Sequence, residues 1–260
     1  EVEETVEFMI SATTDIGLTK NTNQDSFSVR QFRSSYGNVV LAVLCDGMGG
    51  LAKGEVASAT LIRAFEKWSD HQLPQLLRNG LEEQALQRDW NQIITENNEK
   101  IKNYGKQTGI HLGTTVTALL MTDTRYHILN VGDTRAYELA DDIRVLTQDQ
   151  TVVAHEIACG RLTPEEAELD PRRSVLLQCV GASETVQPDY FSGIPRQNAV
   201  YMLCSDGFRH QISPEEIYQY LNPACMADSE CMKKNMEALI ELDKQRQERD
   251  NITVIGIRTY

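Results

Sequence analysis

The fold is decided by the stretch Val39-Val40-Leu41-Ala42-Val43-Leu44-Cys45-Asp46-Gly47-Met48-Gly49-Gly50. Its first seven residues are apolar and rich in β-branched side chains, which is typical of a strand buried on both faces. We expect the strand to end at Asp46-Gly47-Met48-Gly49-Gly50, where three glycines permit backbone conformations that other residues avoid. This end places the carboxylate of Asp46 directly after a buried strand.

Three further acidic motifs lie beside apolar stretches: Asn23-Gln24-Asp25, Cys204-Ser205-Asp206-Gly207 and Arg249-Asp250-Asn251-Ile252-Thr253. Four carboxylates that converge at strand ends repel one another unless a cation lies between them. Carboxylate and carbonyl ligands without His or Cys suit Mg²⁺ and Mn²⁺. The motifs therefore predict a metal-dependent enzyme.

The remaining pattern predicts strands and helices that come in blocks. Apolar residues from Ala57 to Trp68 and from Leu86 to Tyr104 recur at helical spacing, and Pro74 is expected to break the chain between these two helices within residues 73–80. Two capping boxes, at Thr163 and Ser213, predict helix starts, and another helix is expected around Met232 to Ile240. Strands are predicted at residues 8–12, 26–32, 115–121, 126–131, 136–139, 199–204 and 252–257.

Neighbouring predicted strands are joined as hairpins and do not alternate with helices. This order favours the α+β class, with antiparallel sheets covered by helix layers. We find neither an internal repeat nor a low-complexity linker, so we expect residues 1–260 to form a single domain.

The composition is that of a soluble globular protein, with 41% hydrophobic and 24% charged residues. The net charge of −13 opposes binding to nucleic acid, which proteins normally meet with clustered Lys and Arg. We find no apolar run of about 18 residues that could span a membrane, and no signal peptide. Because the first residue is Glu1, the sequence fits a piece of a longer protein as well as a whole one.

None of the six cysteines forms a Cys-x-x-Cys pair. Cys45 and Cys204 lie inside apolar runs, where Cys usually acts as a small buried hydrophobe. This pattern predicts neither a zinc site nor a disulfide framework, and it favours a reduced, cytoplasmic protein.

Taken in order, the motifs resemble those of the metal-dependent type 2C Ser/Thr protein phosphatases (the PPM family), in particular the bacterial branch. A single Asp-Gly is a weak signal because it is also a common turn dipeptide, but six segments in the family's order are a strong one. These segments are Asp15-Ile16-Gly17-Leu18-Thr19-Lys20-Asn21-Thr22-Asn23-Gln24-Asp25, Asp46-Gly47-Met48-Gly49-Gly50, Gly113-Thr114-Thr115, Val131-Gly132-Asp133-Thr134-Arg135-Ala136, Ser205-Asp206-Gly207 and Arg249-Asp250-Asn251-Ile252-Thr253.

The resemblance implies an α-β-β-α sandwich, in which two antiparallel sheets are flanked by helix layers and the metal site lies at one end. It implies one phosphatase catalytic domain over residues 1–260, with a flap-like segment at about 148–174. Within that segment, Arg172-Arg173 fits contact with a phosphoprotein and contact with a nearby carboxylate equally well.

The resemblance also implies a role for each motif residue. Asp46 corresponds to the carboxylate that bridges two metal ions, and the Gly47 carbonyl to a ligand of one of them. Asp206 and Asp250 correspond to further ligands, and Asp25 to a carboxylate that holds metal-bound water.

Asp133 corresponds to a ligand of a third ion that many members bind, although a hairpin turn would explain this residue as well. Lys20 stands where the family commonly has an Arg that holds the substrate phosphate, and we therefore include it among the catalytic and substrate-binding residues. Met48 and Gln24 also depart from residues common in the family. We expect Arg135 to be structural and the five histidines to be non-functional or at the surface.

The function expected from the resemblance is hydrolysis of phosphoserine and phosphothreonine in proteins by a hydroxide that bridges two Mn²⁺ or Mg²⁺ ions. Such a hydrolase would act in bacterial signalling, with phosphoproteins as partners and a Ser/Thr kinase or its targets among them. The alternative is a catalytically silent relative that binds a partner; such members typically lose a direct metal ligand. A metal-dependent nuclease is disfavoured by the charge of −13.

Overall fold

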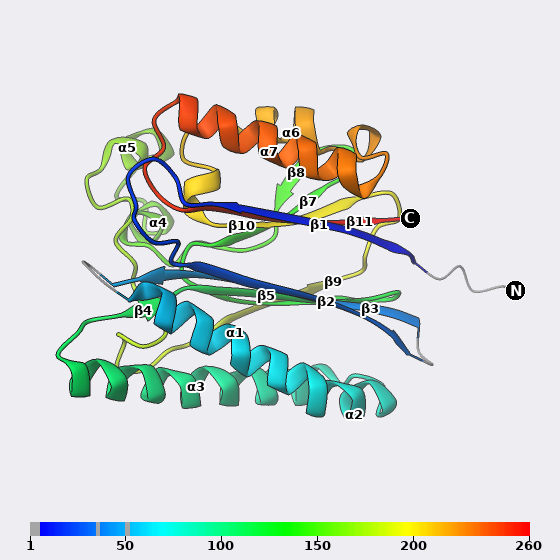
Figure 1. Ribbon diagram of the computed structural model, residues 1–260, viewed down its shortest axis with the longest axis horizontal. Coiled ribbons are helices and arrows are strands. Elements are labelled where there is room, and N and C mark those ends of the chain that lie inside the picture. The colour runs from blue at the N-terminus through cyan, green and yellow to red at the C-terminus, as the bar shows by residue number, and fades with distance from the viewer. Residues whose placement is uncertain (1–5, 35–36, 50–52) are drawn as a thin grey trace, which may run out of the picture.

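Two antiparallel sheets lie face to face, with helices on their outer faces (Figure 1). The structure is a computed structural model and describes residues 6–34, 37–49 and 53–260. The predicted α+β class and the α-β-β-α sandwich are confirmed.

The first sheet has five strands in the order β1-β11-β10-β7-β8. Because β1 pairs along its whole length with β11, segments from near the two ends of the chain lie side by side (Figure 1). The bounds are β1 (Phe8–Asp15), β11 (Ile252–Thr259), β10 (Val200–Cys204), β7 (Arg135–Leu139) and β8 (Ile143–Val145).

The second sheet has the order β2-β3-β5-β6-β9, and the short strand β4 pairs with the end of β3. The predicted hairpin between residues 115–121 and 126–131 is confirmed as the antiparallel pair β5 and β6. The bounds are β2 (Asp25–Ser34), β3 (Gly37–Met48), β4 (Gly113–Thr114), β5 (Val116–Thr122), β6 (Tyr126–Val131) and β9 (Asp189–Gly193).

Helices α1 (Gly54–His71), α2 (Leu73–Arg78) and α3 (Glu83–Thr108) cover the second sheet, whereas α6 (Pro214–Leu221) and α7 (Ser229–Gln245) cover the first (Figure 1). Helices α4 (Val152–Ala158) and α5 (Pro164–Leu169) lie at the end of the sandwich near β4. Short 3₁₀ helices span Asp206–Phe208 and Pro223–Cys225.

Strand β3 is buried on both faces, as its sequence predicts. Val39, Leu41, Val43 and Cys45 pack against the residues of α1 and α3, whereas Val40, Ala42 and Leu44 pack between the two sheets. This alternation follows from the two-residue period of a strand. One apolar run therefore contributes to two of the three hydrophobic cores formed by the described residues.

The structure shows where β3 ends and corrects the prediction for residues 73–80. Strand β3 ends at Met48, inside the predicted segment Asp46-Gly47-Met48-Gly49-Gly50, because Gly47 and Met48 pair with Thr114 and Gly113. Residues 73–78 form helix α2 instead of a break, since Pro74 lies in its first turn, where the missing N–H has no intrahelical partner to lose. Gly50, the last glycine of the opening motif, lies outside the described residues.

Both predicted capping boxes are confirmed. The side chains of Thr163 and Ser213 accept hydrogen bonds from the backbone N–H of Glu166 and Glu216, and each Glu accepts one from the backbone N–H of its cap. By contrast, α4, β8 and β9 were not predicted. They are three to seven residues long, too short for a clear hydrophobic period, and are ordered by their neighbours.

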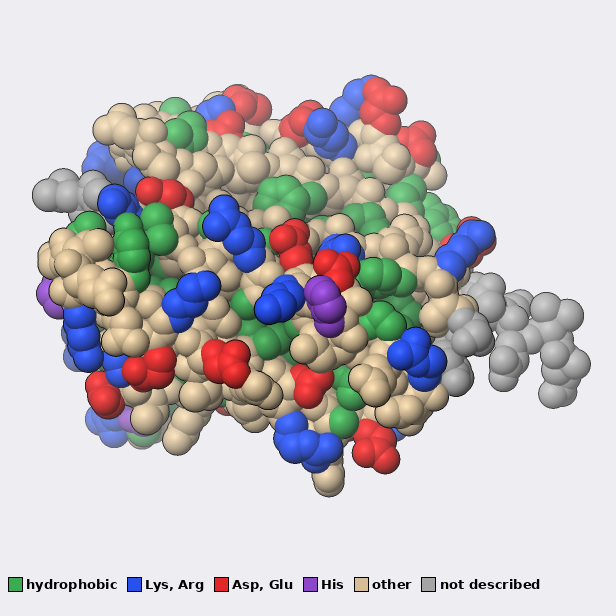
Figure 2. Space-filling model, turned by 60° about the horizontal axis from the view of Figure 1, so that its bottom comes forward, with side chains coloured by type: hydrophobic (Ala, Val, Ile, Leu, Met, Phe, Trp, Pro, Cys, Tyr) green, Lys and Arg blue, Asp and Glu red, His purple; other side chains and the backbone are tan. Residues whose placement is uncertain are grey.

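No helix in the described part of the chain is long and apolar enough to cross a bilayer. Figure 2 shows that acidic and basic side chains are interspersed on the face turned forward in that view. This mixture of both signs differs from the clustered Lys and Arg of a nucleic-acid-binding surface.

We predict that Gly17→Ala destabilises the protein by about 2–4 kcal/mol, from the combined cost of left-handed backbone and overpacking. Gly17 has φ of +76°, and a Cβ atom there would collide with the carbonyl oxygen of Asp250. Gly109→Ala is the matched control, because Gly109 has φ of +69° and open space around its Cβ position. Its cost should be only about 1 kcal/mol. Urea unfolding of both variants measures the difference, and equal losses would contradict the close approach.

A second prediction concerns the buried carboxyl of Asp243 on α7. Burial, with repulsion from Glu248, raises the pKa of Asp243 from 3.8 to about 8. The folded state therefore prefers the protonated form, and this stabilisation is lost as the pH rises from about 4 to about 8. Asp243→Asn should raise the melting temperature relative to the parent protein by an amount that grows over this pH range.

The control for Asp243 is the carboxylate of Asp170, whose pKa is lowered to about 2 by its hydrogen bonds to Arg172. Asp170→Asn should show no such growth between pH 5 and pH 8, because Asp170 stays ionised over that range. If the melting temperatures of Asp243→Asn and the parent ran parallel over this range, the raised pKa of Asp243 would be refuted.

Candidate active site

The topology brings the acidic motifs to one end of the sandwich. Strands β2 and β3 place Asp25 directly opposite Asp46, and the start of β11 lies beside the end of β1 and the end of β10. The start of β7 lies beside the end of β10 in turn. This end therefore carries Asp25, Asp46, Asp133, Asp206 and Asp250, all five of the carboxylates singled out from the sequence.

Asp25 and Asp46 hold their carboxyl groups in a poorly solvated place. Asp25 is buried, and its Oδ2 accepts a hydrogen bond of 2.6 Å from the Thr253 hydroxyl. Burial raises the pKa of Asp25 to about 7, with Asp206 and Asp250 adding repulsion. Burial and the surrounding carboxylates raise the pKa of Asp46 well above its usual range. A divalent cation bound between these two carboxyl groups would favour their charged forms.

The backbone around the Gly47 carbonyl packs tightly against the backbone of Gln24 and of Gly54. The Gly47 N–H donates to the Gln24 carbonyl at 3.1 Å, and a Cβ atom at Gly47 would collide with the backbone of Gly54 at the start of α1. Glycine is therefore required at this point, and the close approach of α1 fixes the backbone next to Asp46.

Asp206 and Asp250 lie in adjacent loops. Asp206 opens the 3₁₀ turn after β10, and Asp250 precedes β11. A Cβ atom at Gly207 would lie 3.4 Å from the Cβ of Asp250, so the two loops are in contact. The Asp206 carboxylate contacts His210, whose Nε2 lies 3.4 Å from its Oδ2.

Lys20 lies in this cluster and pairs with Asp250, with 2.7 Å between its Nζ and the carboxylate Oδ1. Burial opposes the charge of Lys20, but the hydrogen bond to Asp250 and the attraction of Asp46 and Asp206 outweigh it and raise the pKa of Lys20. The ammonium group therefore supplies one positive charge to the cluster.

Asp133 lies beside a cationic group of a different kind. Its carbonyl accepts a hydrogen bond of 2.9 Å from Arg209, whose guanidinium also lies 3.9 Å from the Asp133 carboxylate. Burial and the charge of Asp206 raise the pKa of Asp133 to about 7, against the effect of Arg209. Arg135 forms two hydrogen bonds of 2.7 Å with Asp149, which supports the structural role expected for it.

The donor set fits divalent cations of the hard, oxygen-seeking kind. Among the described residues, Asp25 Oδ1 and Asp206 Oδ1 are buried without a hydrogen-bond partner, so Asp206 has an oxygen free for a cation and Asp25 has one free for a water molecule beside it. In that same part of the chain, no three Asp, Glu, His or Cys side chains are grouped closely enough to hold an ion by themselves. Water and the Gly47 carbonyl would have to complete its coordination, as Mg²⁺ sites commonly allow.

The sequence predicted that all five histidines are non-functional or at the surface, and the structure excludes the surface position for two of them. His127 is buried on β6, and His210 is partly buried between Asp206 and Glu248, so neither is a surface residue. Glu248 was missed altogether. Nothing periodic marks these residues, and only the spacing of four residues between Asp206 and His210 hints at their contact.

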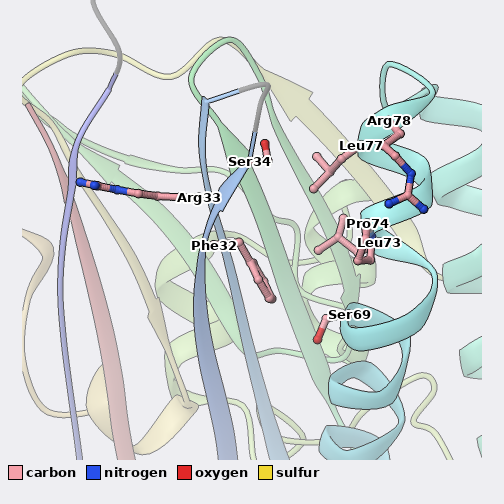
Figure 3. A pocket seen from close by; sticks show the side chains of 8 residues that line it. All are labelled: Phe32, Arg33, Ser34, Ser69, Leu73, Pro74, Leu77 and Arg78. Atoms are coloured by element: carbon pink, nitrogen blue, oxygen red, sulfur yellow. The ribbon is translucent and has the colours of Figure 1, made fainter.

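A separate cavity of about 270 Å³ lies at the far end of β2 (Figure 3). Six residues of β2 lie between Asp25 and Phe32 of its lining, and the two residues are about 23 Å apart along the extended chain. Among the described residues its lining has no carboxylate, so it does not share the chemistry of the acidic cluster. The lining residues are Phe32, Arg33, Ser34, Ser69, Leu73, Pro74, Leu77 and Arg78.

The chain matches a family model described as Protein phosphatase 2C over residues 19–241. It is 33% identical over 246 residues to the serine/threonine protein phosphatase PstP of Mycobacterium tuberculosis, covering 94% of this chain but only 44% of that protein. It is 30% identical over 249 residues to the protein phosphatase PhpP of Streptococcus pneumoniae, covering 94% of this chain and 95% of that one.

Solved structures agree with these sequence relatives. The serine/threonine phosphatase Stp1 of Staphylococcus aureus superposes with a TM-score of 0.83 at 26% identity, covering 99% of this chain and 97% of that one. The catalytic domain of PstP in complex with two manganese ions superposes with a TM-score of 0.78 at 28% identity, covering 98% and 99%. With the acidic cluster at the end of the sandwich, these matches show that the chain belongs to the protein phosphatase 2C family of serine/threonine phosphatases.

Proposed function

We propose that this chain hydrolyses phosphoserine and phosphothreonine in proteins with the help of two bound divalent cations. The observation that carries the proposal is the convergence of Asp25, Asp46, Asp206 and Asp250 at one end of the sandwich, with buried oxygens that have no hydrogen-bond partner among the described residues. A catalytically silent binding module is the alternative. The presence of all the candidate carboxylates favours the enzyme.

In this proposal Asp46, the Gly47 carbonyl, Asp206 and Asp250 would hold the two ions, with Asp46 as a ligand shared by both. When bound, such ions lower the pKa of water to give hydroxide, neutralise the phosphoryl oxygens and align the attack. Asp25 acts through its hydrogen bonds, holding a water molecule in place with one carboxylate oxygen while Thr253 holds the other.

A third ion is part of the proposal, with Asp133 and Asp206 as its ligands. Arg209 beside Asp133 would have to share that carboxylate with the ion. Mn²⁺ and Mg²⁺ are both compatible with the all-oxygen donor set.

We also propose that residues 1–260 form one catalytic domain and that residues 148–174 are a flap beside the site. In support, α4 and α5 of this segment line a groove of about 630 Å³ together with Asp133 and His210. Arg173 lines this groove, whereas the guanidinium of Arg172 pairs with Asp170. The two neighbouring arginines therefore have different surroundings, and Arg173 is the better candidate for contact with a phosphoprotein.

The setting proposed for this activity is cytoplasmic signalling in a bacterium, in which the phosphatase opposes a Ser/Thr kinase or acts on its targets. The relatives named above are bacterial phosphatases, which supports this proposal.

We predict that phosphate release from a phosphothreonine peptide requires added Mn²⁺ or Mg²⁺ and stops when a chelator is added, because the ligands are protein oxygens and water.

Asp46→Ala and Asp206→Ala should lower turnover by several orders of magnitude while the protein stays folded. Removal of one like charge should leave the melting temperature without metal unchanged or higher. Full activity of metal-stripped protein would disprove the mechanism, and near-normal turnover of either variant would remove that residue from the ligand set.

A further prediction concerns Lys20, which we propose attracts the substrate phosphate once the cations compete for Asp250. Lys20→Ala should lower kcat/KM for the phosphopeptide by about 1–3 kcal/mol of transition-state stabilisation, as expected for a charge-assisted hydrogen bond. Lys20→Arg should preserve or improve kcat/KM, because a guanidinium can bind two phosphoryl oxygens. Parent-like kinetics of both variants would show that Lys20 only pairs with Asp250.

A further inference from the structure

Glu248 is a buried carboxylate just outside the acidic motif of β11, with 5% of its surface exposed. Its Oε1 accepts hydrogen bonds from the backbone N–H groups of Arg249 at 2.8 Å and Asp250 at 2.9 Å. This oxygen therefore fixes the backbone from which the Asp250 side chain projects.

The other oxygen of Glu248 faces a different loop. Its Oε2 lies 3.5 Å from Nδ1 of His210, and the opposite ring nitrogen of His210 lies 3.4 Å from Oδ2 of Asp206. The three side chains form a row of carboxylate, imidazole and carboxylate. One residue, Glu248, thus connects the loop after β10 to the loop before β11.

This row distinguishes the two oxygens of Asp206. Oδ2 contacts the imidazole, whereas Oδ1 is buried and has no hydrogen-bond partner within the described ranges. Asp206 also lies close enough to Asp46 and Asp133 for its charge to act on both. The imidazole therefore occupies one oxygen and leaves the other available to a cation.

We propose that His210 and Glu248 are positioning residues that hold Asp206 and Asp250 together in the orientation that a divalent cation requires. Neither residue touches the ion or the phosphate. They lie behind the ligands and contact them from outside, a place where substitutions typically reduce metal affinity about 10–100-fold. This inference rests on the proposed metal-dependent function and adds two residues to it.

The test is titration of the whole chain with Mn²⁺, following free Mn²⁺ by electron paramagnetic resonance, alongside the melting temperature in chelator. His210→Ala and Glu248→Gln should each weaken Mn²⁺ binding about 10–100-fold. In the double variant, the fold loss of Mn²⁺ affinity should be smaller than the product of the two single-variant fold losses, because both residues act through the same row of side chains. Raising Mn²⁺ should restore most phosphopeptide hydrolysis in His210→Ala, since His210 acts on the ligands and not on the phosphate.

Glu237→Gln is the control for charge, because it removes an exposed carboxylate of α7 that is paired only loosely with Lys233 at 3.8 Å. It should bind Mn²⁺ like the parent protein. If Glu248→Gln does not fold, His210→Ala carries the test, because the imidazole is partly exposed, with 20% of its side-chain surface accessible.

A Mn²⁺ affinity equal to that of the parent in folded His210→Ala would overturn the inference. A double variant whose fold loss of Mn²⁺ affinity equals the product of the two single-variant losses would overturn it as well. The parent protein in the same titration separates the two proposals. If the parent binds Mn²⁺ and releases phosphate, the proposed function stands whatever the variants do. If the parent binds no Mn²⁺, the proposed function fails and the inference fails with it.

Discussion

Strand β3 packs one set of alternate side chains against α1 and α3 and the other set against the first sheet. Because both faces are buried, the strand can shift by one residue only by exchanging the two cores that it joins. Its register with β2 is therefore strongly specified, and this register places Asp46 opposite Asp25. The position of the acidic cluster depends on this packing more than on any contact between the carboxylates themselves.

Repulsion within that cluster is a cost that the surrounding structure balances. Lys20 pairs with Asp250, Arg209 lies against Asp133, and His210 lies against Asp206. Each cationic or potentially cationic group thus faces a different carboxylate from the outside of the cluster. Burial and the charges of Asp25, Asp206, Asp133 and Asp250 disfavour the ionised form of Asp46, although Lys20 lies near enough to attract it. This distribution suits a site whose centre is completed by cations.

The loops at this end are held by the backbone as much as by side chains. Gly17 packs on the Asp250 carbonyl, Gly47 on Gly54, and Glu248 accepts two backbone N–H groups. These contacts join segments that lie more than 200 residues apart in the case of Gly17 and Asp250. They hold the site in place where the strands themselves have ended, which is why glycine and a buried glutamate occur there.

The sequence by itself determined the order of the main strands and helices, the capping boxes and the carboxylates at strand ends. The spacing of apolar residues, the turn residues and the helix caps are local properties of the chain. The sequence did not determine α2, α4, β8 or β9, which are too short to carry a period of their own. Nor could it show that His210 lies between Asp206 and Glu248, or that Lys20 faces Asp250. Those relations depend on the pairing of β1, β10 and β11, which brings together residues from both ends of the chain, and only the tertiary structure decides that pairing.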